Sequence, residues 1–140
     1  MKLLIDDANL EKIESLYEYY PIDGVTTNPT ILSKYDDKAS NILKEIRRII
    51  GDNQELHVQI LSEKAEDIVK EAYKIREMLG ENTYVKIPSY KEGFKAMKQL
   101  HAEGVNITAT AIYSPMQTYL AGKAGADYVA PYINRIDNLG

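Results

Sequence analysis

The chain has 140 residues, 44% of them hydrophobic and 27% charged, which is typical of one globular domain with a buried core. Its net charge is −4 and its basic residues are scattered, which argues against a nucleic-acid-binding surface. The absence of cysteine excludes thiol nucleophiles, disulfides and cysteine-ligated zinc, and no apolar run approaches the ~20 residues of a membrane span.

Short apolar runs alternate with longer amphipathic stretches along the whole chain. In the first half we expect strands at 2–5, 24–26 and 56–60, a helix at 8–19 capped by Asp7 or Asn9, and helical segments at 29–33 and 38–50. In the second half we expect strands at 83–87, 106–112 and 128–131. Helices are expected at 62–79, with Ser62 as its cap and Gly80 as its end, at 91–103, and from Pro115 onward.

A strand followed by a helix, repeated along the chain, predicts parallel βα units in a single α/β domain over residues 1–140. A Rossmann-type open sheet and a (β/α) barrel both fit this pattern. The fingerprint glycines of the dinucleotide-binding fold are missing after the first strand, which favours the barrel.

Lys86 stands in the middle of an apolar strand, within Val85-Lys86-Ile87. A lysine is almost never fully buried unless it is paired or used chemically. Desolvation disfavours the ammonium form, so we expect a lowered pKa for Lys86 and a nucleophilic amine, as in Schiff-base enzymes. Most lysines in strands nevertheless lie at a solvated edge or a strand end, so this residue alone does not decide the function.

Other polar residues also lie at the carboxyl ends of the expected strands. Side chains alternate between the two faces of a strand, so five of these polar residues can lie on the same face of the sheet. They are Asp6, Gln59, Lys86, Thr110 and Tyr132. Thr26 and Asn28 close the second strand in a similar manner. In a barrel, the shared direction is the interior at the end where catalytic residues collect. Each residue alone could cap a helix or meet solvent, but the set around one buried lysine favours an active site.

The two histidines, His57 and His101, occupy unrelated places in the pattern, and each is more often structural or exposed than functional. Two histidines cannot form a three-histidine metal site, and no glycine-rich phosphate loop follows a strand. The amino-terminal apolar run is too short for a signal-peptide core, so a cytoplasmic protein is expected.

The chain resembles the transaldolase family, and within it the small fructose-6-phosphate aldolases. The most specific matching segments are Gly24-Val25-Thr26-Thr27-Asn28-Pro29 and Ala130-Pro131-Tyr132-Ile133-Asn134-Arg135-Ile136-Asp137. Further matches are Leu4-Ile5-Asp6, Val58-Gln59, Val85-Lys86-Ile87-Pro88, Thr110-Ala111-Ile112-Tyr113 and Gln117. The resemblance runs from one end of the chain to the other.

The resemblance implies a class I, metal-independent enzyme on a TIM (β/α)8 barrel, with no cofactor. Lys86 would form the Schiff base and Tyr132 would transfer protons with a bound water. Asp6 would orient substrate hydroxyls, and Gln59 and Thr110 would hold the water and the carbinolamine. Thr26 and Asn28 would contact substrate hydroxyls, and Arg135 would bind phosphate. Transaldolases of this family usually have glutamate in place of Gln59 and phenylalanine in place of Tyr132, so this chain is more similar to the aldolase branch.

The number of strands departs from the family pattern. Relatives have eight βα units, whereas this sequence predicts six parallel strands and five helices, an incomplete barrel without the last βα units. Three explanations for the missing βα units remain open: a fragment of a longer enzyme, a shortened gene product, or chains that complete one another. Exposed sheet edges predict a homo-oligomer. The expected partner is a ketone or sugar phosphate, and the alternative function is an inactive assembly or binding module.

Overall fold

The computed structural model describes residues 1–132 and divides them into two compact units. Unit 1 contains Met1–Gln59 and Ile75–Thr83, and unit 2 contains Ile60–Lys74 and the described residues from Tyr84 onward. The interpretation as one domain stays a prediction. Within residues 1–132, no helix is long and apolar enough to cross a membrane.

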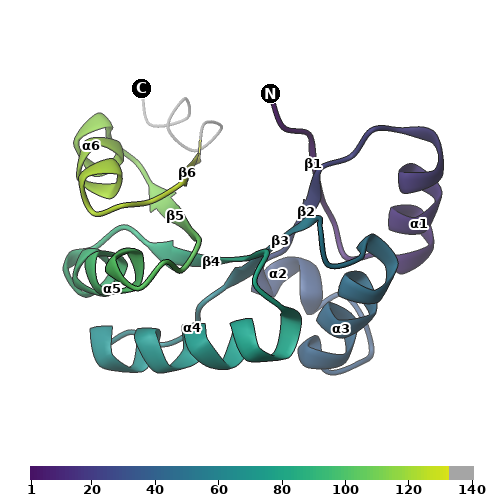
Figure 1. Cartoon of the computed structure of the whole chain (residues 1–140), viewed down its shortest axis with the longest axis horizontal. Coiled ribbons are helices and arrows are strands. Elements are labelled where there is room, and N and C mark those ends of the chain that lie inside the picture. The colour runs from purple at the N-terminus through teal and green to yellow at the C-terminus, as the bar shows by residue number, and fades with distance from the viewer. Residues whose placement is uncertain (133–140) are drawn as a thin grey trace. The chain divides into compact units, whose positions relative to one another are not determined.

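Unit 1 is built from parallel strands with helices between them (Figure 1). Its elements are β1 (Leu4–Asp6), α1 (Leu10–Tyr19), β2 (Gly24–Thr26), α2 (Pro29–Leu32), α3 (Ala39–Ile50) and β3 (Glu55–Gln59). β1 pairs with β2 and β2 with β3, both in parallel. The boundaries expected for β2 are confirmed at both ends, while β3 begins one residue before its expected start.

Unit 2 repeats the same plan. Its elements are β4 (Thr83–Pro88), α5 (Lys91–Ala102), β5 (Ile107–Ile112), α6 (Pro115–Lys123) and β6 (Tyr128–Pro131). The first residue of β4 belongs to unit 1, and α4 (Ala65–Leu79) contributes residues to both units. β4 pairs with β5 and β5 with β6, again in parallel. The six described strands are therefore all parallel and alternate with helices, as expected.

The helix ends follow local capping chemistry. Asn9 caps α1, because its side-chain oxygen accepts the amide hydrogen of Lys12 at 2.9 Å. Ser114 caps α6 in the same way, and Pro115 occupies the first helical position, as predicted. α4 ends at Leu79 and is followed by Gly80 at φ 90°, a left-handed conformation that favours glycine.

The expected Ser62 cap is wrong, because α4 begins at Ala65. The carboxylate of Glu71 accepts the amide hydrogens of Leu61 and Ser62 at 3.0 and 2.8 Å, which satisfies these donors without a helix. The carboxylate of Glu92 accepts the amide hydrogen of Ala65 at 3.0 Å. The amide hydrogens near the start of α4 are therefore satisfied by carboxylates distant in the sequence and not by the hydroxyl of Ser62.

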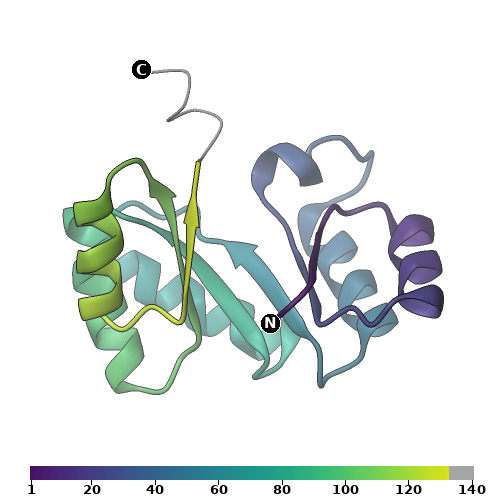
Figure 2. The ribbon, with the colours of Figure 1, turned by 90° about the horizontal axis from the view of Figure 1, so that it is seen from above.

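In each unit the helices lie on one side of the strands (Figure 2). The apolar core of the unit lies between these helices and the strands. In unit 1 the core contains strand residues Val25, Leu56 and Val58 and helix residues Ile13, Ile42 and Ile46. In unit 2 it contains Val85, Ile87, Ile107 and Ala109 from the strands and Ala96, Met97, Leu100 and Ala121 from the helices. Burial of each larger side chain contributes about 1.5–3 kcal/mol.

Arg47 is a charged residue on the buried face of α3, with only 8% of its surface exposed. Its Nη1 donates to the carbonyl oxygens of Gly51 and Gln54 at 2.8 and 2.7 Å. Its Nη2 donates to the carbonyl oxygen of Asn82 at 3.2 Å. Asn82 also accepts the amide hydrogen of Leu56, so one guanidinium joins two segments at the amino-terminal end of β3.

Arg47→Lys is expected to lower the free energy of unfolding by about 2–3 kcal/mol, because an ammonium cannot reach all three carbonyls and leaves buried acceptors unpaired. Urea unfolding at neutral pH measures the change. The matched control is Arg48→Lys, at an exposed residue whose Nε pairs with Glu45, where we expect a change below about 0.5 kcal/mol. Equal losses in the two variants would contradict the role of Arg47.

Candidate active site

The strand ends of unit 1 place polar residues on one face. Asp6 is paired in register with Thr26, and Thr26 with His57. Paired residues in a parallel sheet point to the same side, so these three residues share a face, and Gln59 joins them two residues after His57. Asp6 is exposed, while Thr26 and Gln59 are half-buried. The face predicted for Asp6, Thr26 and Gln59 is thus present at the carboxyl ends of β1, β2 and β3.

Asn28 follows β2 and serves as the cap of α2. Its Oδ1 accepts the amide hydrogen of Ile31 at 3.0 Å, and Pro29 occupies the first turn. The buried Thr27 before it donates its hydroxyl to the carbonyl oxygen of His57 at 3.0 Å. These contacts explain why a threonine, an asparagine and a proline follow one another here, and they hold Asn28 at the end of β2.

Asp7, beside Asp6, forms a small polar cluster in the segment between β1 and α1. Its carboxylate pairs with Lys12 Nζ at 2.9 Å and accepts the hydroxyl of Tyr35 at 3.3 Å. The hydrogen bond from Lys12 lowers the pKa of Asp7 from 3.8 to about 2. The cluster joins the residue next to Asp6 to the segment after α2.

The lowered pKa of Asp7 has a pH signature. The folded state binds the Asp7 proton less tightly than the unfolded chain, so the stabilisation is fully present above pH 3.8 and is lost as the pH falls towards about 2. Asp7→Asn is expected to destabilise the protein near neutral pH, with a difference from the parent that shrinks across this window. Urea unfolding at several pH values measures it. A difference that stays constant from pH 6 to below pH 3 would contradict the assignment.

Lys86 lies inside β4 and is buried, with 7% of its surface exposed. It is paired in register with Thr108, and Pro88 is paired with Thr110, so Lys86 and Thr110 share a face. Thr110 is also buried, at 5% exposure. The burial of Lys86 and its shared face with Thr110 agree with the expectation from the sequence.

Two aromatic residues share the face of Lys86, one before it on β4 and one level with it on β6. Tyr84 precedes Lys86 by two residues on the same strand, and Tyr128 is paired with Thr108 on β5. The rings of Tyr84 and Tyr128 meet edge to face, with centroids 5.3 Å apart. They form an aromatic layer on the face that carries Lys86, which favours a poorly solvated environment for the amine.

β5 contains an irregularity next to Thr110. The register shifts between Ala109 and Ile112, and Ala111 has φ 54°, which is uncommon for a residue other than glycine. Ala109 is paired with Val129 and Ile112 with Pro131, so both point to the helix side although they are three residues apart. The strict alternation expected for β5 therefore ends at Ala111.

Tyr132 follows β6 and contacts the segment after this irregularity. Its amide hydrogen bonds to the carbonyl oxygen of Ile112 at 3.2 Å. Its ring packs against Tyr113, with centroids 5.4 Å apart and planes inclined by 36°. Tyr132 is 38% exposed. Arg135, the remaining residue predicted for the site, lies outside the described residues.

The structure thus assembles the predicted residues in two sets, one in each unit. Asp6, Thr26, Asn28 and Gln59 belong to unit 1, and Lys86, Thr110 and Tyr132 to unit 2. His57 is buried and lies 3.3 Å from Glu55 through its Nε2, and Glu55 also pairs with Lys2 at 3.2 Å. The polar alternation Glu55, His57, Gln59 is the sequence signal that could have shown this polar row. Among residues 1–132 no cluster of three metal-binding side chains occurs.

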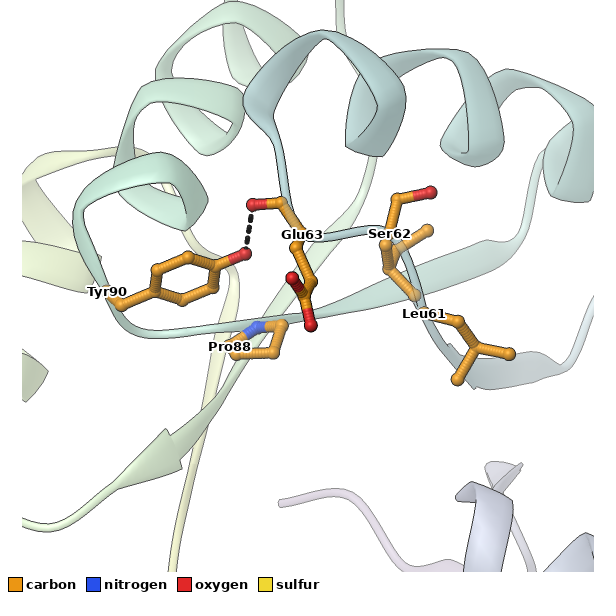
Figure 3. A pocket seen from close by; sticks show the side chains of 6 residues that line it. Leu61, Ser62, Glu63, Pro88 and Tyr90 are labelled. Carbon is orange, nitrogen blue, oxygen red and sulfur yellow. Dashed lines mark hydrogen bonds between the residues drawn. The ribbon is translucent and has the colours of Figure 1, made fainter.

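A pocket of about 370 Å³ lies in unit 2 beyond the carboxyl end of β4 (Figure 3). It is lined by Ile60, Leu61, Ser62, Glu63, Pro88 and Tyr90. The Tyr90 hydroxyl donates to the carbonyl oxygen of Glu63, and burial raises the pKa of this phenol. Pro88 stands two residues after Lys86, so the pocket borders the strand that carries the lysine.

Comparison with solved structures defines the fold class. The chain is similar to the 4-hydroxy-tetrahydrodipicolinate synthase of Methylacidiphilum fumariolicum SolV, with a TM-score of 0.62, 10% identity, and coverage of 99% of this chain and 57% of that one. It is also similar to the sialic acid aldolase of Ruminococcus gnavus, with a TM-score of 0.59, 11% identity, and coverage of 98% and 57%. Together with the alternating elements and parallel strands, these likenesses define a protein of the TIM (β/α)8-barrel class.

Residues 3–140 match the family described as transaldolase/fructose-6-phosphate aldolase, and the chain belongs to this family. It is 43% identical to the probable fructose-6-phosphate aldolase of Streptococcus pneumoniae, over 99% of this chain and 63% of the relative. It is 41% identical to the probable transaldolase of Thermoplasma acidophilum, over 100% of this chain and 63% of the relative. The chain therefore spans about 63% of the length of these curated relatives.

Proposed function

We propose that this chain is a class I enzyme that joins Lys86 to a ketose as a Schiff base and makes or breaks a carbon–carbon bond in sugar phosphates. The observation that carries the proposal is the burial of Lys86 on the face it shares with Thr110, in a chain of this family. A buried amine backed by aromatic rings is suited to covalent catalysis.

The reaction follows from the chemistry of an amine and a ketone. The neutral Lys86 Nζ attacks the ketone carbon and water leaves, which gives an iminium ion. The bond between the α- and β-carbons of the iminium breaks when the β-hydroxyl loses its proton. The β-carbon leaves as the aldehyde, and the electron pair of the broken bond moves towards the iminium and gives an enamine. Protonation of the enamine and hydrolysis release the ketone and restore the lysine. The proton carrier in this proposal is Tyr132, acting with a bound water.

The other predicted residues keep their proposed roles. Asp6 orients substrate hydroxyls, and Gln59 and Thr110 hold the water and the carbinolamine. Thr26 and Asn28 contact substrate hydroxyls, and Arg135 binds phosphate. The pair of Gln59 and Tyr132 supports the aldolase reaction, in which fructose 6-phosphate gives dihydroxyacetone and glyceraldehyde 3-phosphate, over transfer to a second sugar.

Borohydride trapping tests the proposal directly. The 140-residue chain is incubated with dihydroxyacetone or fructose 6-phosphate, reduced with borohydride and digested, and the peptides are weighed. An adduct confined to the peptide that contains Lys86 is the expected result. If the folded chain forms no adduct, the hypothesis that this chain is an enzyme fails, and an assembly or binding module becomes the better interpretation.

Association between copies of this chain is a further part of the proposal. Large apolar side chains are exposed on α6, where Met116 and Tyr119 are each 63% exposed and Leu120 is 42% exposed. Exposed apolar surface of this kind is commonly covered by a partner. Light scattering of the purified chain measures the mass, and a monodisperse monomer would contradict a homo-oligomer. A cytoplasmic location stays a prediction.

A further inference from the structure

Gln117 uses both ends of its amide. It lies in the first turn of α6. Its Oε1 accepts the amide hydrogen of Tyr113 at 2.8 Å and the hydroxyl of Ser114 at 3.5 Å. Its Nε2 donates to the carbonyl oxygen of Ser89 at 2.9 Å and to that of Ala111 at 3.5 Å. One half-buried side chain therefore joins the segments that follow β4 and β5.

The two segments joined by Gln117 come directly after the strands that carry Lys86 and Thr110. Ser89 is the first residue after β4, and its amide hydrogen bonds to the carbonyl oxygen of Thr110 at 2.9 Å. Ser89 is 4% exposed, so its backbone carbonyl needs a donor within the protein. Gln117 supplies that donor and so completes the connection between the ends of β4 and β5.

The contacts of Gln117 with Ala111 and Tyr113 flank the irregularity in β5. Ala111 holds a left-handed backbone at φ 54°, which an alanine adopts only when its surroundings favour it. Because Ala111 is an extra residue in the strand, Ile112 turns to the helix side and is 1% exposed. Tyr113 is thereby directed to the face that carries Thr110, where its ring meets Tyr132.

Tyr132 therefore depends on this segment through two contacts. Its ring packs on Tyr113, and its amide hydrogen bonds to Ile112, which lies between the two residues whose backbones Gln117 holds. All of these contacts lie within unit 2. A change at Gln117 would reach Tyr132 without any direct contact between the two side chains.

We infer that Gln117 is a positioning residue, whose amide holds the left-handed turn at Ala111 and the backbone of Tyr113 and so sets the Tyr132 phenol relative to the face that carries Lys86. This inference rests on the proposed function for its catalytic consequence. It requires a side chain that donates and accepts at once, which glutamine does and neither glutamate nor methionine can do.

Amide hydrogen exchange separates the two halves of the side chain. Gln117→Met removes both donor and acceptor, and we expect exchange of the Ser89 and Tyr113 amides to rise at least about tenfold. Gln117→Glu keeps an acceptor for the Tyr113 amide but loses the donor to the Ser89 carbonyl oxygen, which loosens the segment after β4. Of the two amides, only that of Ser89, which donates to Thr110, is then expected to exchange faster. The Val85 amide, which donates to Asn106 inside the sheet, reports global opening in each variant. Gln99→Met, at an exposed glutamine of α5, is the matched control and should change neither amide.

The ring resonance of Tyr132 tests the last step. Tyr132→Phe assigns the resonance, and Tyr113→Leu gives its position when the neighbouring ring is absent. In Gln117→Met the Tyr132 resonance is expected to move towards its position in Tyr113→Leu. An unchanged resonance, or a Tyr113 amide that exchanges no faster than Val85, would overturn the inference. If the methionine variant does not fold, the different responses of Ser89 and Tyr113 in Gln117→Glu decide the question.

The catalytic consequence has a separate readout. Borohydride trapping at Lys86 is expected to stay within about twofold of the parent in Gln117→Met, while incorporation of solvent deuterium into dihydroxyacetone falls about tenfold. A parent chain without an adduct would defeat the proposed function, and the exchange and resonance data would still decide the positioning role. A parent with an adduct and a Gln117→Met variant with unchanged deuterium incorporation would defeat the catalytic role of Gln117 alone.

Discussion

Lys86→Met is expected to abolish the borohydride adduct and to lower the rate of ketose cleavage by at least about 10³-fold, because the thioether cannot form a Schiff base. Methionine keeps an unbranched chain of similar length at a site that is 7% exposed, so the fold is expected to persist. Mass spectrometry of the reduced peptide measures the adduct, and a thermal melt verifies the fold.

Lys98→Met is the matched control for Lys86→Met. Lys98 is an exposed lysine on α5, outside the strands that carry the candidate site, and its loss should leave both the adduct and the rate unchanged. The decisive comparison is the location of the adduct. An adduct that persists on another peptide of Lys86→Met would show that the chemistry resides on a different lysine.

Gly93→Ala is expected to lower the free energy of unfolding by about 3 kcal/mol. Gly93 lies in the first turn of α5, and a β-carbon there would come 2.0 Å from the carbonyl oxygen of Pro88. This neighbour is backbone at the end of β4 and cannot turn aside as a flexible side chain would. Either α5 or the end of the strand that carries Lys86 must move, so weaker trapping at Lys86 is also expected.

Gly122→Ala, in the same unit, is expected to change the free energy of unfolding in the opposite direction from Gly93→Ala. Gly122 is an exposed residue of α6, and a β-carbon there would meet nothing within 4 Å. Alanine is the better helix former, so the variant is expected to gain about 0.5–1 kcal/mol. Urea unfolding measures both variants. A change of the same sign in both would show that close packing at Gly93 is not the cause of its effect.

The order of elements could be predicted because local chemistry sets most of their ends. β2 is bounded by Gly24 and by the Thr27–Pro29 turn, and α6 begins at a serine followed by proline. The start of α4 was predicted wrongly, because Glu71 and Glu92 satisfy the donors near Ser62 and Ala65 from elsewhere in the sequence. Contacts between residues so far apart in the sequence leave no trace in the periodic pattern of apolar residues.

The candidate site was predictable to the extent that strand alternation holds. Two-residue alternation correctly places Lys86 and Thr110 on one face, and Asp6, Thr26 and Gln59 on one face. It gives no indication of the irregularity at Ala111, because alanine has no special preference for a left-handed backbone. Alternation also places Glu55 and His57 on one face, but it does not predict that the two side chains are buried and lie 3.3 Å apart.

The extra residue in β5 decides which side chains after Ala111 lie on each face of the strand, and point substitutions would not reveal this. If β5 ran through Ala111 with strict alternation, Ile112 would occupy the face of Thr110 and Tyr113 would turn into the helix layer. Loss of the irregularity at constant length would thus exchange a phenol for an aliphatic side chain beside Tyr132, whereas deletion of Ala111 would leave both side chains on their present faces. Gain or loss of one irregularity in this strand is therefore a route by which relatives of this chain could acquire different site surfaces on the same barrel.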